Sequence, residues 1–393
     1  MIRTNFRKLA LSSILISIPF HAHAQDTSAV ADRLKELLAA ESMDMDWQAV
    51  SGDSSKMVLE GVTFGTPGEK ERFSIGDLTL EGISEDNGGY RIDTISTQPQ
   101  HIDEDKVGVD ISSMVLSGVS LPPPGSTDAV ASMMMYESFN LASLEVKMAD
   151  KPVFSLSNVS AEIKPPKDGS AMEFTGSVEK FNADLSDVED PQSKAVIEAL
   201  GYQNVNGYIE AAGSWQPTDG NLALSQYDIT VENAGTLGLS FNLGGYTPAF
   251  LKSMQDLQKK AAEQSDSDNS TLGLAALGLM QQLTFQSASI RFDDDTLIGK
   301  VLDYMAKQQG VKPADVANQA KAIVPFMTSQ LNNPELSGQI TAAVGKFLDD
   351  PQSIEISAEP GSPVPFALIA AGAMATPLDL PKTLGVTVRA NED

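Results

Sequence analysis

Met57-Val-Leu-Glu-Gly-Val-Thr63 is a heptapeptide that the chain repeats with small changes as Leu78-Thr-Leu-Glu-Gly-Ile-Ser84 and Met114-Val-Leu-Ser-Gly-Val-Ser120. In a strand, alternate residues share a face. Each copy has its apolar residues on one parity before the glycine and on the other parity after it. One residue in the left-handed conformation returns all of these side chains to one face and bends the strand. We therefore predict three bulged strands, whose bulges lie at Gly61, Gly82 and Gly118.

Weaker copies of the pattern follow along the chain. Phe154-Ser-Leu-Ser-Asn-Val-Ser160 has Asn158 at the switch, and asparagine is the residue next most tolerant of the left-handed conformation. Looser copies begin at Leu222 and Leu283. The spacing between copies is irregular, which argues against a solenoid of fixed period. We predict an α+β fold, β-rich, with a long curved antiparallel sheet and a helix-rich C-terminal section packed on it.

Periodicity and turn residues divide the chain into four parts. Residues 1–24 are expected to be a signal peptide. Residues 25–245 combine an amphipathic N-terminal helix with the repetitive strands. Residues 246–350 are rich in helices, with one intervening strand. Residues 351–393 are expected to supply C-terminal strands and a short buried helix that complete the sheet.

The signal peptide is predicted from a basic start and an apolar core that ends at Pro19 before a small-x-small motif. Cleavage is expected between Ala24 and Gln25. The apolar core, 9–20, is too short to span a bilayer. The chain contains no cysteine, so it has neither a lipidation site at the cleavage point nor disulfides. These features predict a protein free in the periplasm of a Gram-negative bacterium, with no transmembrane span in the mature chain.

Helical spacing is strongest in the C-terminal half. Helices are expected from Asp190, Thr247, Asp295, Pro313 and Pro334, and the helix after Pro313 should bend or break at Pro325. Two further segments, 272–283 and 365–375, are so apolar that we expect buried helices. For 365–375, insertion into one leaflet or contact with a hydrophobic ligand is the alternative.

The charge of the chain restricts its partners. The formal net charge is −26, which disfavours nucleic acid and anionic membrane surfaces. An acidic surface could bind a cationic partner, or it could simply keep the protein soluble. The partners that remain are a lipid or other apolar ligand and an envelope protein.

The residues that usually perform catalysis are scarce. His21 and His23 lie in the signal peptide, which leaves His101 in a polar stretch typical of an exposed turn. With one histidine and no cysteine, zinc in its usual ligand sets is not expected. The acidic clusters around Asp184 and at 293–295 precede helices, where capping explains them. We predict no catalytic, cofactor-binding or metal-binding residues.

The Leu-x-Leu-x-Gly-Val strands after an export signal resemble those of AsmA-like and YdgA-like (DUF945-type) bacterial envelope proteins. The resemblance covers about residues 50–160 and carries over no functional residue. It implies a long curved antiparallel sheet and a role in moving or accommodating lipids at the envelope. Members of that class are often anchored by an uncleaved N-terminal helix, whereas the signal in this chain is typical of a cleaved one.

Three hypotheses for function follow. The first is a non-catalytic periplasmic protein that binds a lipid or another apolar ligand in a trough, or that supports envelope maintenance. The second is a structural or protein-interaction protein, whose trough is filled by its own helices. The third is a hydrolase that uses carboxylates alone.

Overall fold

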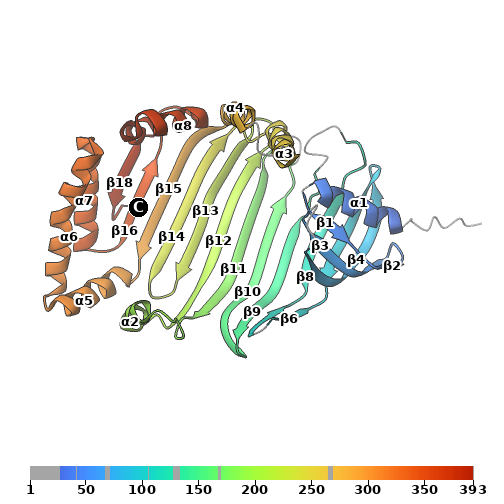
Figure 1. Cartoon of the computed structure of the whole chain (residues 1–393), viewed down its shortest axis with the longest axis horizontal. Helices are drawn as coiled ribbons and strands as arrows, with labels where there is room; N and C mark the ends of the chain where they lie inside the picture. The colour runs from blue at the N-terminus through green and yellow to red at the C-terminus, as the bar shows by residue number, and fades with distance from the viewer. Residues whose placement is uncertain are drawn as a thin grey trace, which may run out of the picture.

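The computed structural model describes residues 27–40, 42–66, 71–104, 106–126, 133–166, 170–263 and 269–392. Eighteen strands in these ranges join in one antiparallel sheet that does not close on itself (Figure 1). The predicted α+β class, with a long antiparallel sheet and mainly C-terminal helices, is confirmed. The predicted signal peptide and its cleavage site at Ala24 and Gln25 lie outside the described residues.

The strands follow the order of the chain. They are β1 (Asp44–Asp46), β2 (Ala49–Gly52), β3 (Lys56–Gly65), β4 (Arg72–Asp86), β5 (Gly89–Thr97), β6 (Gln100–Glu104), β7 (Val107–Ile111), β8 (Met114–Leu121), β9 (Ser138–Met148), β10 (Lys151–Lys164), β11 (Met172–Asp184), β12 (Asn204–Gln216), β13 (Asn221–Val231), β14 (Gly235–Gly244), β15 (Thr284–Asp294), β16 (Ser353–Ala358), β17 (Val364–Pro365) and β18 (Val386–Ala390).

The topology is largely a meander, in which most strands pair with the strand that follows them in the chain. β1 and β2 both pair with β3, and β3, β4 and β5 pair in succession. β5 with β6, and β8 with β7, form the two arms of one long hairpin, because β5 pairs with β8 and β6 with β7. β9 pairs with β7 and β8, and β9 to β16 then continue strand by strand to β18. This connectivity needs no crossover between the strands.

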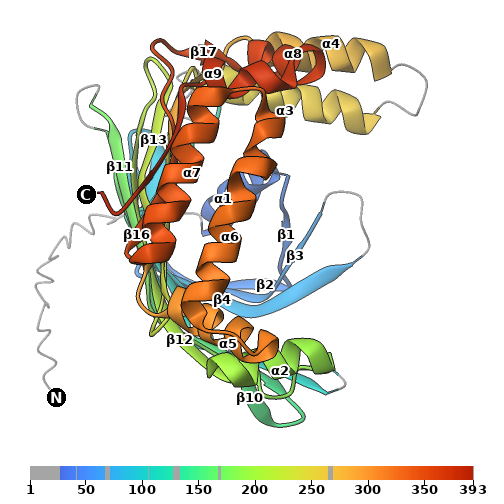
Figure 2. The ribbon, with the colours of Figure 1, turned by 90° about the vertical axis from the view of Figure 1, so that its left-hand side faces the viewer.

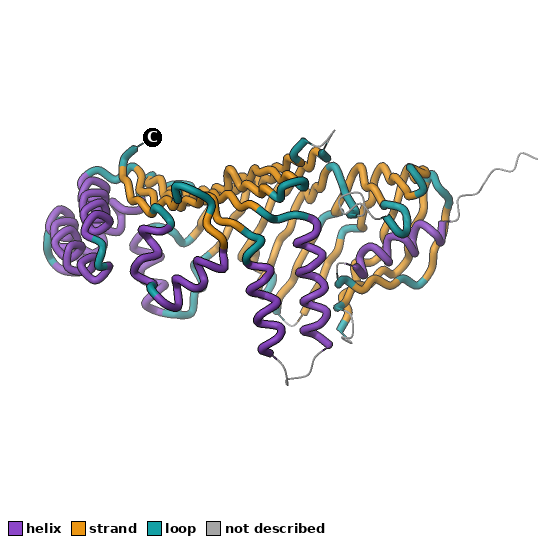
Figure 3. The backbone as a smooth tube through the Cα atoms, turned by 90° about the horizontal axis from the view of Figure 1, so that it is seen from above, coloured by secondary structure: helices purple, strands orange, loops and turns teal. Residues whose placement is uncertain are grey.

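Apart from α1, which precedes β1, the helices lie in the connections between strands. They are α1 (Thr27–Ala40), α2 (Pro191–Leu200), α3 (Pro248–Glu263), α4 (Asn269–Met280), α5 (Leu297–Gln309), α6 (Pro313–Thr328), α7 (Pro334–Asp349), α8 (Phe366–Ala375) and α9 (Leu380–Thr383), with 3-10 turns at Ser329–Leu331 and Pro377–Asp379. Figure 2 shows the sheet edge-on and bent, with helices on its inner side. Figure 3, from above, shows α3 and α4 projecting from that side. We call this side the concave face.

The glycines of the repeated heptapeptide lie in the left-handed region, with φ of 61° at Gly61, 67° at Gly82 and 63° at Gly118; Asn158 has φ of 50°. At Gly61 the ladder with β4 shifts by one residue, and the shift is reversed between Val62 and Thr63, so the original register returns. At Gly82, Gly118 and Asn158 the pairing on either side keeps one register. The expected extra residue is absent there because the facing strands change phase at the same level.

The residues that lie opposite one another at the level of Gly82 show how the facing strands change phase. Asp93 on β5 lies opposite both Gly82 on β4 and Gly118 on β8, between pairs that remain in register. Ile92 and Ile95, on either side of Asp93, are both buried, so β5 also changes parity at this level. Three neighbouring strands therefore change phase together, and their buried apolar side chains stay on the concave face.

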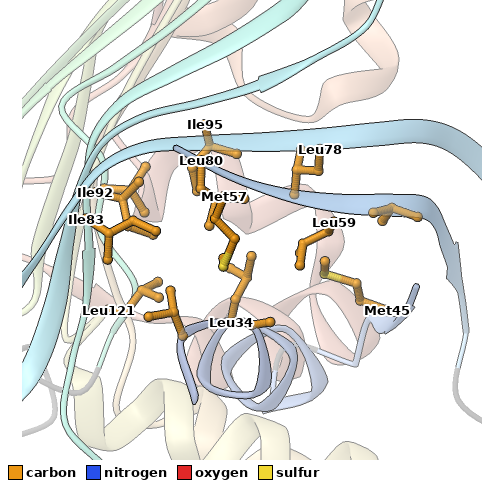
Figure 4. Close-up of a cluster of buried hydrophobic side chains, with 14 of the residues drawn as sticks. Leu34, Met45, Met57, Leu59, Leu78, Leu80, Ile83, Ile92, Ile95 and Leu121 are labelled. Atoms are coloured by element: carbon orange, nitrogen blue, oxygen red, sulfur yellow. The ribbon is translucent and has the colours of Figure 1, made fainter. Parts of the chain in front are cut away.

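The first hydrophobic core lies at the N-terminal end of the sheet, where β1 to β5 and β8 curl around α1 (Figure 4). Val30 and Leu34 on α1 belong to one buried cluster with Met57, Leu59 and Leu80, and all five are at most 4% exposed. Arg33 on α1 holds the helix to the segment after β8. Its Nε donates to the carbonyl of Pro122 at 2.6 Å, and a terminal nitrogen donates to the carbonyl of Pro123 at 3.1 Å.

The second core is smaller and lies at the C-terminal end. Phe347 on α7 contacts Phe292 on β15 edge to face, with ring centroids 6.5 Å apart. Leu336 and Ala343, on the same side of α7, are buried against the last strands with Val388 and Ala390. The two ends of the sheet are thus each covered by a helix.

Two segments differ from expectation. α4 and α8 occupy the apolar segments predicted to be buried, yet α8 contains no buried residue and the described α4 side chains are half-buried or exposed. The prediction that these helices are buried was wrong, because no second layer of the described residues covers them. Pro325 also fails to break α6, which continues to Thr328. The proline has no N–H to donate to the carbonyl of Lys321, yet only three residues of the helix follow it.

Replacement of Gly82 by alanine is expected to destabilise the fold. Its φ of 67° disfavours any Cβ, and an added Cβ would lie 2.2 Å from Oδ2 of Asp93. We expect Gly82→Ala to lower the free energy of unfolding by about 1–2 kcal/mol, measured by denaturant titration. Gly338→Ala, in exposed helix with nothing near the added carbon, is the control and should raise stability by about 0.5–1 kcal/mol. If Gly82→Ala and Gly338→Ala changed the free energy of unfolding equally, Gly82 would not need its left-handed conformation for the strand to change phase.

Candidate functional site

One row of directly opposed residues crosses ten strands on the concave face. Cross-strand partners share a face of a sheet, so the pairing defines the row. Every member is apolar. The row, called the central row, is Met114, Leu141, Val159, Val178, Ile209, Ile229, Leu237, Phe292, Ile354 and Ala390.

A second row on the same face lies nearer to the edge where α3 and α8 attach. It shares the parity of the central row on β12 and β14, so both rows point to the same side. This upper row is also apolar throughout. Its members are Met172, Trp215, Leu222, Leu243, Phe285 and Val364.

The opposite face is polar along the same strands. Hydroxyl pairs bridge neighbouring strands, as between Ser160 and Ser177 at 2.9 Å and between Ser240 and Ser289 at 2.9 Å. Next to the central row, one opposed row on this face runs Asn140, Ser160, Ser177, Glu210, Asp228, Gly238, Arg291, Glu355 and Arg389. The polar face is suited to water, and the apolar face needs a cover.

Helices cover the central row at its two ends and leave its middle open. Leu141 and Ala390, near the ends, are buried. From Val159 to Ile354 no member of the row is buried, and Leu237 is 40% exposed. The neighbouring opposed pair Ile290 and Ile356 is 53% and 52% exposed. A stretch of sheet with an apolar, uncovered concave surface is therefore the main candidate site in the described part of the chain.

An apolar pocket of about 190 Å³ lies at the N-terminal end of this surface. It is enclosed between Leu34 and Leu38 on α1 and strand residues that include Leu116 and Phe139. Met114, the first member of the central row, also lines it, so the pocket adjoins the open surface. Its lining side chains are hydrocarbon or thioether apart from Thr97 and Tyr136. Such a pocket suits the end of an alkyl chain.

Aromatic contacts hold the covering helices to the upper row. The indole of Trp215 donates to the carbonyl of Tyr246 at 2.7 Å, and the Tyr246 ring contacts Phe250 at the start of α3. Phe250 is 1% exposed. Phe366, the first residue of α8, meets Phe285 edge to face with centroids 6.4 Å apart. Both helices are anchored at their first turns, beside the open surface.

The residues considered for chemistry from the sequence are scattered on other parts of the structure. Asp184 and Asp187 pair with Lys151 at 3.0 Å and 2.8 Å. Hydrogen bonds from Ser186 and then Lys151 lower the pKa of Asp184 to about 2. Asp190 caps α2 through the Ser193 amide. Asp294, in the acidic cluster expected to cap a helix, accepts from the Ile298 amide in the first turn of α5. These carboxylates serve ion pairs and helix caps.

His101 lies on β6 in a small ionic cluster. Its Nδ1 is 2.5 Å from Asp110 and its Nε2 is 2.9 Å from Asp103. Lys147 binds Asp110 at 2.8 Å and Glu145 at 3.1 Å. The carboxylates, Asp110 first and then Asp103, raise the pKa of His101, since the charged ring can donate to both. The cluster lies at exposed positions and ties β6, β7 and β9 together.

The candidate site was only partly visible in the sequence. The heptapeptide indicated that apolar side chains share one face, but it did not indicate which of them remain uncovered. Ile290 and Ile356 belong to short alternating segments that look like ordinary half-buried strands. The signal that could have found them is the run of Ser and Thr on the opposite parity, which marks one face as solvated and leaves the other without a second sheet.

Comparisons with known proteins add little. A family model described as an uncharacterized protein matches residues 228–391, less than half of the chain. The match covers part of β13 and everything from β14 to β18, with α3 to α9. No curated protein matches the chain. Of the helices in the described ranges, none has the length and apolar character that crossing a bilayer requires.

The titration of His101 tests the ionic cluster. We expect its pKa, followed by NMR of the imidazole, to lie above the ordinary value of about 6.5, and to fall toward that value in Asp110→Asn. Because the folded-state pKa is raised, the stabilisation is present below the unfolded-state pKa and is lost as pH rises through the folded-state pKa. His101→Gln should remove this pH dependence of unfolding. An imidazole that titrates at or below the ordinary value would contradict the cluster.

Proposed function

We propose that the protein is a non-catalytic carrier that binds the acyl chains of a lipid, or a similar apolar ligand, on its concave face. The central row is the observation that supports the proposal. It combines ten opposed apolar residues with a middle that the described helices leave half-exposed. Monomeric proteins rarely leave large contiguous apolar surfaces to water unless those surfaces bind something.

The shape of the site favours an elongated ligand. The surface extends across strands from the pocket beside α1 to the edge of the second core, and the pocket can take one end of an alkyl chain. The central and upper rows contain no ionisable residue, so an apolar ligand that covers them takes no charged side chain out of water. A polar headgroup would remain at the open side.

The cellular setting belongs to the same proposal. The N-terminal sequence favours export, and we place the protein in the periplasm after removal of residues 1–24. A role in lipid handling at the envelope also agrees with the resemblance to AsmA-like and YdgA-like proteins.

The two other hypotheses are less well supported. A structural protein with a self-filled trough should bury its concave rows, whereas Ile290 and Ile356 are each more than half exposed. A hydrolase needs positioned carboxylates, and the acidic residues discussed above are engaged in ion pairs and caps. A partner protein that covers the concave face would instead support the structural hypothesis.

Charged residues in the middle of the surface should abolish ligand binding. Ile290→Glu/Ile356→Glu changes two exposed, directly opposed residues, so the fold should tolerate it. We expect the affinity for the neutral dye N-phenyl-1-naphthylamine to fall by about tenfold or more. Native mass spectrometry should find lipid on the wild-type protein and none on the variant.

The matched control is Tyr208→Glu, which replaces an exposed aromatic residue on the polar face. It should leave dye affinity and lipid content unchanged. A wild-type protein that carries no lipid and binds no dye would refute the proposal. So would recovery of a stoichiometric protein partner that is lost in Ile290→Glu/Ile356→Glu while no lipid is found.

A further inference from the structure

α4 and α8 form an apolar surface that the rest of the described structure does not cover. The two helices contact each other along one edge of the sheet, as Figures 1 and 2 show. In a chain of which 20% is charged, neither helix contains an ionisable residue. A helix that is apolar all round is normally buried in protein or in lipid.

Exposure is high on both helices. The exposed positions of α4 between 272 and 280 run more than half the way round the helix, at about 100° per residue. α8 has no buried residue. The large exposed side chains of this surface are Leu274 (71%), Leu277 (41%), Met280 (42%), Leu368 (62%) and Met374 (80%). We call these five residues the α4/α8 surface.

The chemistry of this surface points to hydrocarbon as its cover. Protein interfaces carry roughly one hydrogen bond per 100–200 Å² and a polar rim. The described side chains of α4, from Leu272 to Met280, and all those of α8 have no hydrogen-bond donor or acceptor other than weak thioether sulfur. These side chains therefore offer a partner protein almost no group for the hydrogen bonds that protein interfaces usually contain. Acyl chains need no hydrogen bonds at all.

The dimensions exclude a span and favour shallow insertion. α4 has 12 residues and α8 has 10, whereas a bilayer core of about 30 Å needs about 20 helical residues. Polar residues bound both helices where lipid headgroups would lie. Gln281 and Gln282 follow α4, and exposed Asp379 and Lys382 follow α8.

The surface is continuous with the concave face. Phe366 begins α8 and contacts Phe285 of the upper row. A leaflet that met α4 and α8 would therefore lie at the edge of the apolar sheet. Only the first turn of α8 separates the two surfaces.

We infer that α4 and α8 are a membrane-docking element that inserts among the acyl chains of one leaflet. The insertion is driven by the hydrophobic effect rather than by charge, because the element itself is uncharged. The net charge of −26 on the chain repels anionic headgroups. Zwitterionic membranes should therefore bind the protein better than anionic ones. This inference stands whether or not the concave face binds lipid.

Flotation of the purified protein with phosphatidylcholine vesicles tests the inference. The protein should float with these vesicles, and replacing a third of the lipid by phosphatidylglycerol should weaken binding. Leu274→Glu/Met374→Glu should reduce vesicle binding by about tenfold or more. Phe326→Glu is the matched control, because Phe326 is a 75% exposed apolar residue on α6. It should float as the wild type does.

A fluorescent reporter separates insertion from surface adsorption. The chain has no cysteine, so Leu274→Cys, Met374→Cys and Phe326→Cys can each carry one nitrobenzoxadiazole dye. On addition of phosphatidylcholine vesicles, the dye at 274 and at 374 should brighten and shift to the blue. The dye at 326 should not change.

Three results would overturn the inference: a wild-type protein that does not float, equal losses in Leu274→Glu/Met374→Glu and Phe326→Glu, or a dimer that Leu274→Glu/Met374→Glu abolishes in the absence of any vesicle binding. The last result would assign the surface to a second copy of the chain. N-phenyl-1-naphthylamine affinity in solution, which Leu274→Glu/Met374→Glu should leave unchanged, tests the carrier proposal separately.

Discussion

The structure depends on one constraint: a bent sheet must keep its apolar side chains on the inner side through every bend. A residue in the left-handed conformation reverses the face on which the following residues of a strand lie, so the apolar residues after it must change parity to stay inside. At Gly61 the register with β4 shifts and then returns between Leu59 and Thr63. Gly82 and Gly118 change phase together with Asp93 on the strand between them. As a result, the apolar side chains on both sides of these residues line the first core.

This constraint explains why the protein has two small cores and an open middle. A single-layered sheet of this length offers more apolar area than its own helices can cover. α1 covers one end and α7 covers the other, and aromatic pairs anchor α3 and α8 at the upper edge. The stability of the middle then comes from cross-strand contacts on both faces, including the hydroxyl pairs of the polar face. Apolar area that stays exposed to water stabilises a purely structural protein less than buried area does, but it is available to bind the ligand of the proposed carrier.

Much of the fold could be predicted because its signals are local. The start and end of α2 follow from Asp190 and Gly201, which cap it as expected. The positive φ of Asn158 follows from its place in a degenerate heptapeptide. The failures concern relations between distant segments. Bulges were expected at Gly82 and Gly118, but the facing strand bends with them and the register is preserved. α4 and α8 were expected to be buried because composition reports how apolar a segment is and not what lies over it.

The sequence by itself determined the period of each element, the residues at which strands change phase, and helix ends such as those of α2. These features depend on a few neighbouring residues and on backbone sterics. Only the tertiary structure decided which apolar surfaces are covered. Covering requires segments far apart in the chain to meet: Phe347 with Phe292, or Phe366 with Phe285. The uncovered remainder, in the middle of the sheet and on α4 and α8, is therefore a property of the assembled fold.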